Sequence, residues 1–400
     1  MDLVGIDAIR AARELLADVV RRTPMEHSRV LEDRAGGPVH LKCENLQRTG
    51  SFKIRGAYLR IHGLSAEQRA CGVVAASAGN HAQGVALAAS MLGTSATVFM
   101  PAGAPLPKLA ATRNYGADVH LVGDVLEDAL TAAVEFAERT GTVFIHPFDH
   151  PDVVAGQATV GLEILEQLPE VRTVLVATGG GGLVGGVAAA VKATRPDVRV
   201  IGVQAEQAAA WPGSLAAGRP LRLDSMNTMA DGIAVGLPGD VTYAHVSKLV
   251  DDVLTVSEEA LSRALLLCLE RAKLLVEPAG VAAVAAVLDN PGRFETPLCA
   301  VLSGGNVDPL LLSHVIRHGM GAAGRYLSLG IVIPDRPGSL AGLLHKVGEL
   351  GANVVDVSHA RFGRKLGLGE VNVWLSLETR GNDHCAQVVQ ALRAAGYRTG

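Results

Sequence analysis

Lys53 is a candidate for covalent chemistry, because it lies at the predicted start of a helix over residues 53–62. Ser51, two residues earlier, is predicted to be the N-cap of that helix. A lysine in the first helical turn faces the positive end of the helix dipole, which lowers its pKa. A neutral amine can form a Schiff base with an aldehyde. Taken alone, Lys53 is better explained as an ordinary surface lysine, so other motifs must decide.

Four consecutive glycines form a candidate phosphate site: Gly179, Gly180, Gly181 and Gly182. They follow a predicted strand over residues 171–177 and open a predicted helix over residues 183–194. Unhindered N–H groups at a helix N-terminus bind phosphate, whereas a plain turn would gain nothing from four flexible glycines.

The same loop allows a second interpretation. Gly180, Gly182 and Gly185 satisfy the dinucleotide pattern G-x-G-x-x-G, which would indicate an NAD-dependent oxidoreductase. That class needs an acid at the end of the next strand, predicted over residues 198–203, where Glu206 lies slightly beyond.

Two further turns carry polar side chains. Residues 77–84 read Ser-Ala-Gly-Asn-His-Ala-Gln-Gly, and their N–H groups with Asn80 could hold a carboxylate and a ligand oxygen. A capped helix with a buried His81 explains this segment equally well. Residues 303–306, Ser-Gly-Gly-Asn, could be simply a turn, and Glu277 could be simply a helix-capping acid.

Composition excludes several classes of protein. The net charge of −4 comes without a basic run, which argues against nucleic acid as a partner, and no apolar run is long enough to span a membrane. The N-terminus does not have the pattern of a signal peptide. The five cysteines are scattered, odd in number and without C-x-x-C spacing, so we expect no metal and a cytoplasmic protein. Neither a G-x-S-x-G elbow nor a P-loop occurs.

Alternating strands and helices must position these turns, and this alternation predicts an α/β fold with a parallel sheet covered on both faces. The predicted strands cover residues 39–42, 72–76, 97–100, 118–122, 143–146, 171–177, 198–203 and 298–302. The predicted helices cover residues 6–20, 53–62, 85–91, 108–115, 125–139, 154–168, 183–194, 257–272, 281–288 and 310–318. Residues 206–252 are less regular and are expected to contribute loops.

The regular alternation of strands and helices stops at a glycine-rich stretch, residues 319–324, and we place a linker at residues 321–325. Beyond it the pattern predicts an α+β ferredoxin-like module that lacks most of its last strand. Its predicted elements are a strand over 326–333, a helix over 339–350, strands over 354–362 and 370–377, and a helix over 384–395.

The order of four motifs in this sequence resembles that in fold type II pyridoxal-phosphate enzymes, the tryptophan synthase β-like family. These motifs are SFKIRGA around Lys53, SAGNHAQG at 77–84, the four glycines and Ser303-Gly-Gly-Asn. Within that family, SFKIRGA and SAGNHAQG are similar to threonine dehydratases (threonine ammonia-lyases). The resemblance covers about residues 1–320. It implies a catalytic domain of two subdomains, in which a small subdomain of about residues 48–150 is inserted into a large one.

The resemblance also implies a role for each motif toward pyridoxal 5'-phosphate. Lys53 would form the Schiff base and, once the substrate amine has displaced it, would remove the α-proton as general base. Glu277 would lie near the cofactor. The cofactor phosphate would bind Gly179, Gly180, Gly181 and Gly182, the ring would contact Phe52, Asn80 and Ser303, and the substrate carboxylate would bind Ser77, Ala78, Gly79, Asn80 and His81.

Three departures from relatives narrow the expected reaction. Ile54 stands where cysteine and threonine synthases carry an acid, and Ala78 stands where serine racemases carry a serine that acts as a base. Pro212 stands where the racemase-like divalent-cation site needs an acid. We therefore expect elimination, from L-threonine to 2-oxobutanoate and ammonia, and also from L-serine to pyruvate.

Residues 326–400 resemble an ACT domain, which implies regulation by an amino acid or nucleotide at the loop Asp335–Leu340. We expect a homo-oligomer, a dimer or a tetramer, and an amino-acid substrate. Several alternatives stay open: a serine dehydratase or related β-eliminating enzyme, an NAD-dependent oxidoreductase, and a non-catalytic amino-acid sensor. The physiological role, isoleucine synthesis or threonine breakdown, also stays open.

Overall fold

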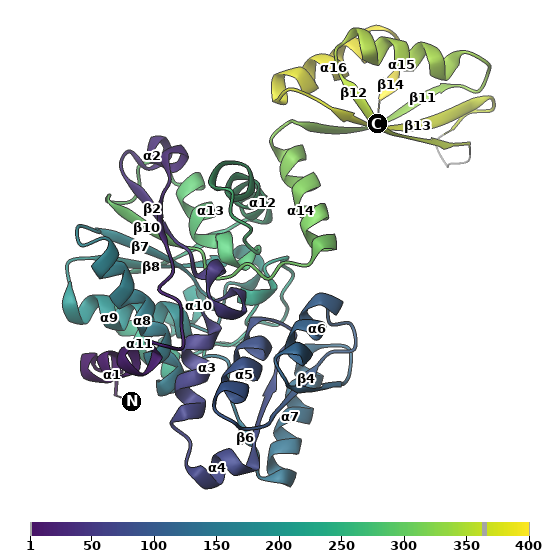
Figure 1. The fold of residues 1–400 in the computed structure, drawn as a ribbon. Helices are drawn as coiled ribbons and strands as arrows, with labels where there is room; N and C mark the ends of the chain where they lie inside the picture. The colour runs from purple at the N-terminus through teal and green to yellow at the C-terminus, as the bar shows by residue number, and fades with distance from the viewer. Residues whose placement is uncertain (1, 362–365, 400) are drawn as a thin grey trace. The chain divides into compact units, whose positions relative to one another are not determined.

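The computed structural model describes residues 2–361 and 366–399 and divides into two compact units, one ending at Leu312 and one starting at Ser313 (Figure 1). Each unit has a hydrophobic core of its own. Within the described ranges, no helix is both long and apolar enough to cross a bilayer.

The larger sheet of the first unit has six strands in the order β1-β2-β10-β7-β8-β9. All pairs are parallel except at one edge, where β1 runs antiparallel to β2. Every residue of the central strands β7 and β10 is buried, as is typical of parallel strands with helices on both faces. The strands are β1 (Met25–His27), β2 (Val39–Lys42), β7 (Thr173–Ala177), β8 (Arg199–Ala205), β9 (Asp252–Val256) and β10 (Leu298–Val301).

Helices α8 and α9 pack against each other beside this sheet, and glycines allow their close approach. A Cβ at Gly186 of α9 would lie 2.6 Å from the carbonyl oxygen of Val154 in α8, so no larger residue fits there. The helices of this part are α1 (Ile6–Leu16), α2 (Arg29–Ala35), α8 (Pro151–Gln167), α9 (Gly182–Thr194), α10 (Ala210–Ala217), α11 (Asp240–Leu249), α12 (Glu258–Leu267) and α13 (Ala282–Asp289).

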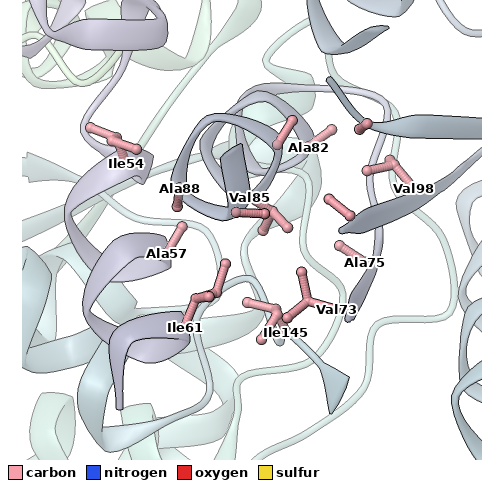
Figure 2. Close-up of a cluster of buried hydrophobic side chains, with 14 of the residues drawn as sticks. Ile54, Ala57, Ile61, Val73, Ala75, Ala82, Val85, Ala88, Val98 and Ile145 are labelled. Atoms are coloured by element: carbon pink, nitrogen blue, oxygen red, sulfur yellow. The ribbon is translucent and has the colours of Figure 1, made fainter. Parts of the chain in front are cut away.

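The smaller sheet of the first unit is wholly parallel, in the order β5-β4-β3-β6. Figure 2 shows how α3 turns Ile54, Ala57 and Ile61 toward α5 and the strands, at the spacing that places side chains on one helix face. The elements are α3 (Lys53–His62), α4 (Ala66–Cys71), β3 (Val73–Ala76), α5 (Asn80–Met91), β4 (Ala96–Met100), α6 (Leu106–Asn114), β5 (Asp118–Leu121), α7 (Leu126–Thr140) and β6 (Val143–Phe144).

The second unit contains an antiparallel sheet in the order β12-β13-β11-β14. Alternate residues of β13, from Val371 to Leu377, are buried, so one face of the sheet carries the core that α15 and α16 cover. The elements are β11 (Tyr326–Pro334), α15 (Ser339–Glu349), β12 (Asn353–Ala360), β13 (Glu370–Glu378), α16 (Asn382–Ala394) and the two-residue β14 (Arg398–Thr399). Helix α14 (Pro309–Ala322) spans the boundary between the units.

The three sheets confirm the predicted fold class of two parallel α/β subdomains followed by an antiparallel α+β domain. The prediction for residues 206–252 is wrong, because this segment contains α10, α11 and the start of the edge strand β9. These short helices are held by tertiary packing, for example by the fully buried Trp211, which a periodicity search does not detect.

Several element boundaries also differ from the prediction, among them the following. Ser51 is not the N-cap of α3; Phe52 takes that position, and Ser51 instead forms a β-bridge with Gly304. Helix α5 begins five residues earlier than predicted, at Asn80. Helix α14 continues to Ala322, past the predicted end. The predicted strand end at Phe362 lies outside the described residues.

Candidate active site

Lys53 lies at the first position of α3, and its Nζ donates a hydrogen bond to the carbonyl oxygen of Pro147 at 3.0 Å. Its Nζ also lies 5.2 Å from the centre of the Phe52 ring. Loss of hydration lowers the pKa of Lys53 to about 8, while the nearby carboxylate of Glu277 opposes that shift. A lowered pKa was predicted, but its largest cause is burial. A much larger fraction of the amine is therefore neutral near neutral pH than for an ordinary lysine.

Helix α3 is held on both sides, so the start of the helix is fixed. Its apolar face packs into the core of the smaller sheet (Figure 2). On the other side it touches α8, where a Cβ at Gly156 would lie 2.6 Å from the Cα of Gly56. Helix α3 thus connects the two sheets of the first unit and places Lys53 between them.

The four glycines connect β7 to α9, as predicted, and Gly181 is the N-cap with a φ of 95°. Among the described residues, no group accepts a hydrogen bond from the backbone N–H of Gly179, Gly180, Gly181 or Gly182. Free N–H groups at a helix N-terminus attract an anion such as a phosphate.

Neighbouring side chains orient these N–H groups. Trp211 Nε1 donates to the carbonyl oxygen of Gly179 at 2.7 Å, and Thr242 Oγ1 donates to that of Gly180 at 2.6 Å. Within a trans peptide the carbonyl and the following N–H point in opposite directions. The N–H groups of Gly180 and Gly181 therefore point away from Trp211 and Thr242. Both side chains come from the segment predicted as loops, so sequence reasoning missed them.

The turn after β10 lies directly beside the start of α3, because Phe52 N–H donates to the carbonyl oxygen of Ser303 at 3.3 Å. Ser303 is only 4% exposed, and its hydroxyl has no hydrogen-bond partner among the described residues. This hydroxyl is thus available to a ligand held near Lys53.

Asn80, Glu277 and Asn306 form a hydrogen-bonded group near Lys53. Asn80 Nδ2 donates to Glu277 Oε1 at 2.6 Å, and Asn306 Nδ2 donates to Asn80 Oδ1 at 2.8 Å. Burial, followed by the charge of Asp231, raises the pKa of Glu277 to about 7. Glu277 is therefore more than a capping acid, and Asn306 is a site residue that sequence reasoning treated as part of a turn.

The loop Ser77–His81 divides into an open part and a closed part. Ser77, Ala78, Gly79 and Asn80 are partly exposed, and Ser77 Oγ accepts from Gly79 N–H at 3.1 Å. His81 turns into the core, where its Nε2 bonds with the carbonyl oxygen of Ile145 at 2.8 Å. Burial, assisted by Lys53, lowers the pKa of His81 to about 3. Its side chain is thus a neutral core histidine, and only its backbone N–H could serve a ligand.

Next to this site, an ion pair joins a helix beside the smaller sheet to a short helix beside the glycine loop. Lys108 of α6 donates to Asp231 at 2.7 Å, and Lys108 is buried. Asp231 begins the short helix η4 (Asp231–Ile233), whose Ile233 lies against Gly179. The sequence offered no signal for this pair, since a lysine and an aspartate so far apart in the chain match no motif.

Together these residues form a site at the carboxyl ends of parallel strands, where α/β proteins bind ligands. It offers an amine with a lowered pKa, an anion cradle and several polar donors, the set that a phosphorylated aldehyde requires. Among the described residues, no group of three or more His, Cys, Asp or Glu side chains could hold a metal ion.

The sequence matches the family described as pyridoxal-phosphate dependent enzyme over residues 16–304. It is 47% identical to an L-threonine ammonia-lyase of Thermotoga maritima, over 99% of this chain and 98% of that protein. It is 43% identical to a catabolic L-threonine dehydratase of Escherichia coli K12, over 78% of this chain and 96% of that protein. The C-terminal unit is thus shared with the first relative and largely not with the second.

Solved structures agree on the fold. A threonine deaminase from T.th. matches with a TM-score of 0.72 and 43% identity, over 76% of this chain and 99% of that one. A maize serine racemase matches with a TM-score of 0.75 and 38% identity, over 78% of this chain and 97% of that one. Fold similarity therefore does not separate elimination from racemisation.

Proposed function

We propose, since the chain belongs to the pyridoxal-phosphate-dependent enzymes and, within them, to the threonine ammonia-lyases, that it converts L-threonine to 2-oxobutanoate and ammonia. The observation that carries this proposal is the buried amine of Lys53, whose pKa is lowered to about 8, in the same site as the free N–H groups of Gly179, Gly180, Gly181 and Gly182. The family match favours this interpretation over the NAD-dependent oxidoreductase.

The residues of the site fit the cofactor. The cradle of glycine N–H groups would hold its phosphate, and Lys53 would hold its aldehyde carbon. The free hydroxyl of Ser303 would meet the pyridine nitrogen, Asn80 the phenolic oxygen, and Phe52 would lie near the ring. When bound, pyridoxal phosphate withdraws electrons from the α-carbon of the substrate.

The protein's own residues would have two tasks in this reaction: they would hold the substrate and move one proton. The partly exposed loop from Ser77 to Asn80, with the backbone N–H of His81, would hold the substrate carboxylate. Lys53, released when the substrate amine takes its place, would accept the α-proton on Nζ, because its lowered pKa makes the neutral amine easier to reach. The β-hydroxyl would then leave as water, with the proton that Lys53 has accepted, and a second water would hydrolyse the product to the keto acid and ammonia.

Ala78 supports elimination over racemisation. Racemisation requires a second base on the opposite face of the substrate, and the methyl group of Ala78 can neither accept nor donate a proton. Ile54 is completely buried in the core and likewise supplies no acid beside Lys53. We propose L-serine, giving pyruvate, as a second substrate, because it has the same β-hydroxyl leaving group.

Amino-acid regulation is proposed for the second unit. A hollow of about 430 Å³ lies at the end of β11, and an effector carboxylate could pair there with Arg336 or Arg361. The loop Asp335–Leu340 lines it, and Asp335 already bonds Arg361 at 3.1 Å. Titration of isoleucine, valine and AMP against activity tests this proposal, and Arg336→Ala should abolish the response if the hollow is the effector site.

The assignment of domains along the chain is also a proposal. Residues 1–320 would be the catalytic domain with a small subdomain of about residues 48–150, residues 321–325 the linker, and residues 326–400 the ACT-like regulatory domain. A homo-oligomer and a role in isoleucine synthesis or threonine breakdown are proposed on resemblance. Light scattering of the purified enzyme tests the first, and growth of a deletion strain without isoleucine tests the second.

The decisive experiment measures keto acid formed from threonine and from serine by Lys53→Ala and by the wild-type enzyme. Lys53→Ala should lose both activities. Lys248→Ala, which removes an exposed lysine on α11, is the matched control and should keep them. An active Lys53→Ala enzyme would refute the mechanism, and the ratio of kcat/KM values decides between threonine and serine.

A further inference from the structure

Three side chains close to Lys53 are joined by hydrogen bonds in series. The donor-to-acceptor direction of the whole series is fixed at one end. Asn306 Nδ2 donates to the main-chain carbonyl oxygen of Thr49 at 2.6 Å and to Asn80 Oδ1 at 2.8 Å. Asn80 Nδ2 in turn donates to Glu277 Oε1 at 2.6 Å. Asn306 and Asn80 are 226 residues apart in the sequence.

The direction follows from hydrogen-bonding chemistry. A main-chain carbonyl oxygen can only accept, so the Asn306 atom that faces Thr49 must be the amide nitrogen. The same nitrogen also faces Asn80, which must therefore present its amide oxygen. The amide nitrogen of Asn80 then faces the carboxylate of Glu277, which accepts. Only one orientation of the Asn80 amide satisfies all three bonds.

Two backbone glycines leave room for these three side chains. A Cβ at Gly50 would overlap the Asn306 amide, and a Cβ at Gly304 would overlap Glu277 Oε1 and lie 3.0 Å from Asn80 Nδ2. Thr49, a β-branched residue, has a φ of 61°, a backbone conformation that costs energy. Thr49 holds this strained conformation while its carbonyl oxygen accepts the Asn306 bond.

We propose that Asn306 and Glu277 are positioning residues that hold Asn80 so that an N–H group, and not the amide oxygen, faces the cofactor. Asn80 Nδ2 has two hydrogens, and Glu277 takes one, which leaves the other for a ligand. This inference rests on the proposed function, which assigns Asn80 to the phenolic oxygen of the cofactor. A donor at that oxygen stabilises its ionised form, whereas an amide oxygen would repel it.

The test uses the Asn306→Asp holoenzyme. Aspartate cannot donate to Thr49 or to Asn80, but it accepts from the Asn80 nitrogen and so rotates that amide. We expect the cofactor absorption to shift from the visible toward the near-ultraviolet band and kcat to fall about tenfold, as for one lost hydrogen bond to a charged group. Asn45→Asp is the control, because Asn45 touches the same turn but bonds to Leu275 and not to Asn80.

A double-mutant cycle distinguishes a role of Asn306 in positioning Asn80 from a general role in stabilising the fold. If Asn306 acts through Asn80, then Asn80→Ala and Asn80→Ala/Asn306→Ala will have the same absorption spectrum. A further shift in the double variant would overturn the proposal. The cycle also serves if Asn306→Asp does not fold.

The outcomes distinguish the two levels of the argument. A wild-type protein without a cofactor band would overturn both the proposed function and this inference. An active, coloured wild-type enzyme whose Asn306→Asp variant keeps the wild-type spectrum and kcat would overturn the inference alone. A shift in Asn45→Asp equal to that in Asn306→Asp would also overturn it, since charge rather than orientation would then be the cause.

Discussion

Replacement of Arg55 by methionine tests how the helix that carries Lys53 is held. Arg55 is fully buried and donates to Glu44 through two nitrogens, each at 2.8 Å, and to Glu163 at 2.7 Å. Lys42 reaches Glu163 at 2.6 Å, so two positive and two negative charges are buried together. Methionine keeps most of the volume of the side chain, so the variant removes charge without a large cavity.

The expected loss follows from the burial of Glu44. This residue is 0% exposed, and without Arg55 it keeps a hydrogen bond from the Thr23 hydroxyl at 2.6 Å. Removing one partner of a buried ion pair costs about 3–5 kcal/mol, because the remaining charge is uncompensated. A loss of this size is a large part of the roughly 5–15 kcal/mol that stabilises a typical domain.

The loss should depend on pH with a defined sign. Burial acts to raise the pKa of Glu163, but Arg55 and Lys42 together hold it below its usual value of 4.5. A carboxylate with a depressed pKa stabilises the fold above its unfolded pKa, and this contribution disappears as the pH falls. Protonation also relieves the uncompensated charges of the variant. Arg55→Met should therefore lose more free energy of unfolding near pH 8 than near pH 3, which lies below the usual carboxyl pKa of 4.5.

Urea unfolding followed by circular dichroism at both pH values measures these differences. Arg60→Met is the matched control in the same helix; its partly exposed pair with Asp152, at 3.7 Å, should be worth only about 0–1 kcal/mol. Adding Glu44→Gln to Arg55→Met should restore part of the stability by removing the uncompensated charge. A loss no greater than that of Arg60→Met, or a greater loss at the lower pH, would refute the reasoning.

Three other predictions concern the site. Gly181→Ala should lower cofactor affinity at least about tenfold, measured by fluorescence titration, because φ is 95° and a Cβ would overlap Trp211, whereas Gly213→Ala meets no atom within 4 Å and should be harmless. The kcat should rise as the pH increases through about 8, since Lys53 acts as a base in its neutral form, and Glu277→Gln should move this midpoint lower; a flat profile would contradict this. Lys108→Met should raise the KM for threonine about fivefold by breaking the partly buried pair with Asp231, and an unchanged KM would show that the pair is unimportant.

Much of the fold was predictable because its signals are local. Strand and helix periodicity indicated a parallel α/β arrangement followed by an α+β module, the family resemblance added the division into two subdomains, and the sheet order confirms that fold class. Residues 206–252 were not predictable in this way, because α10 and α11 are short and depend on contacts of residues such as Trp211. Periodicity detects a helix only when the helix itself carries a long apolar stripe.

The candidate site was predictable as a set of groups but not as an arrangement. The motif around Lys53 contains Arg55, yet nothing in the sequence pairs Arg55 with Glu163, 108 positions further along the chain. Trp211 and Thr242, which orient the glycine loop, and the pair of Lys108 with Asp231 were likewise invisible. Such contacts join distant segments, and no local spacing records them.

The sequence by itself determined which chemical groups the protein has: a lysine at a helix start, four glycines before another helix, and Ala78 in place of a second base. Only the tertiary structure decided how each group acts. It lowers the pKa of Lys53 mainly by burial, turns His81 into the core, and sets the direction of the Asn80 amide through Asn306. Hydration and hydrogen-bond partners are supplied by residues far away in the chain, and folding alone brings them together.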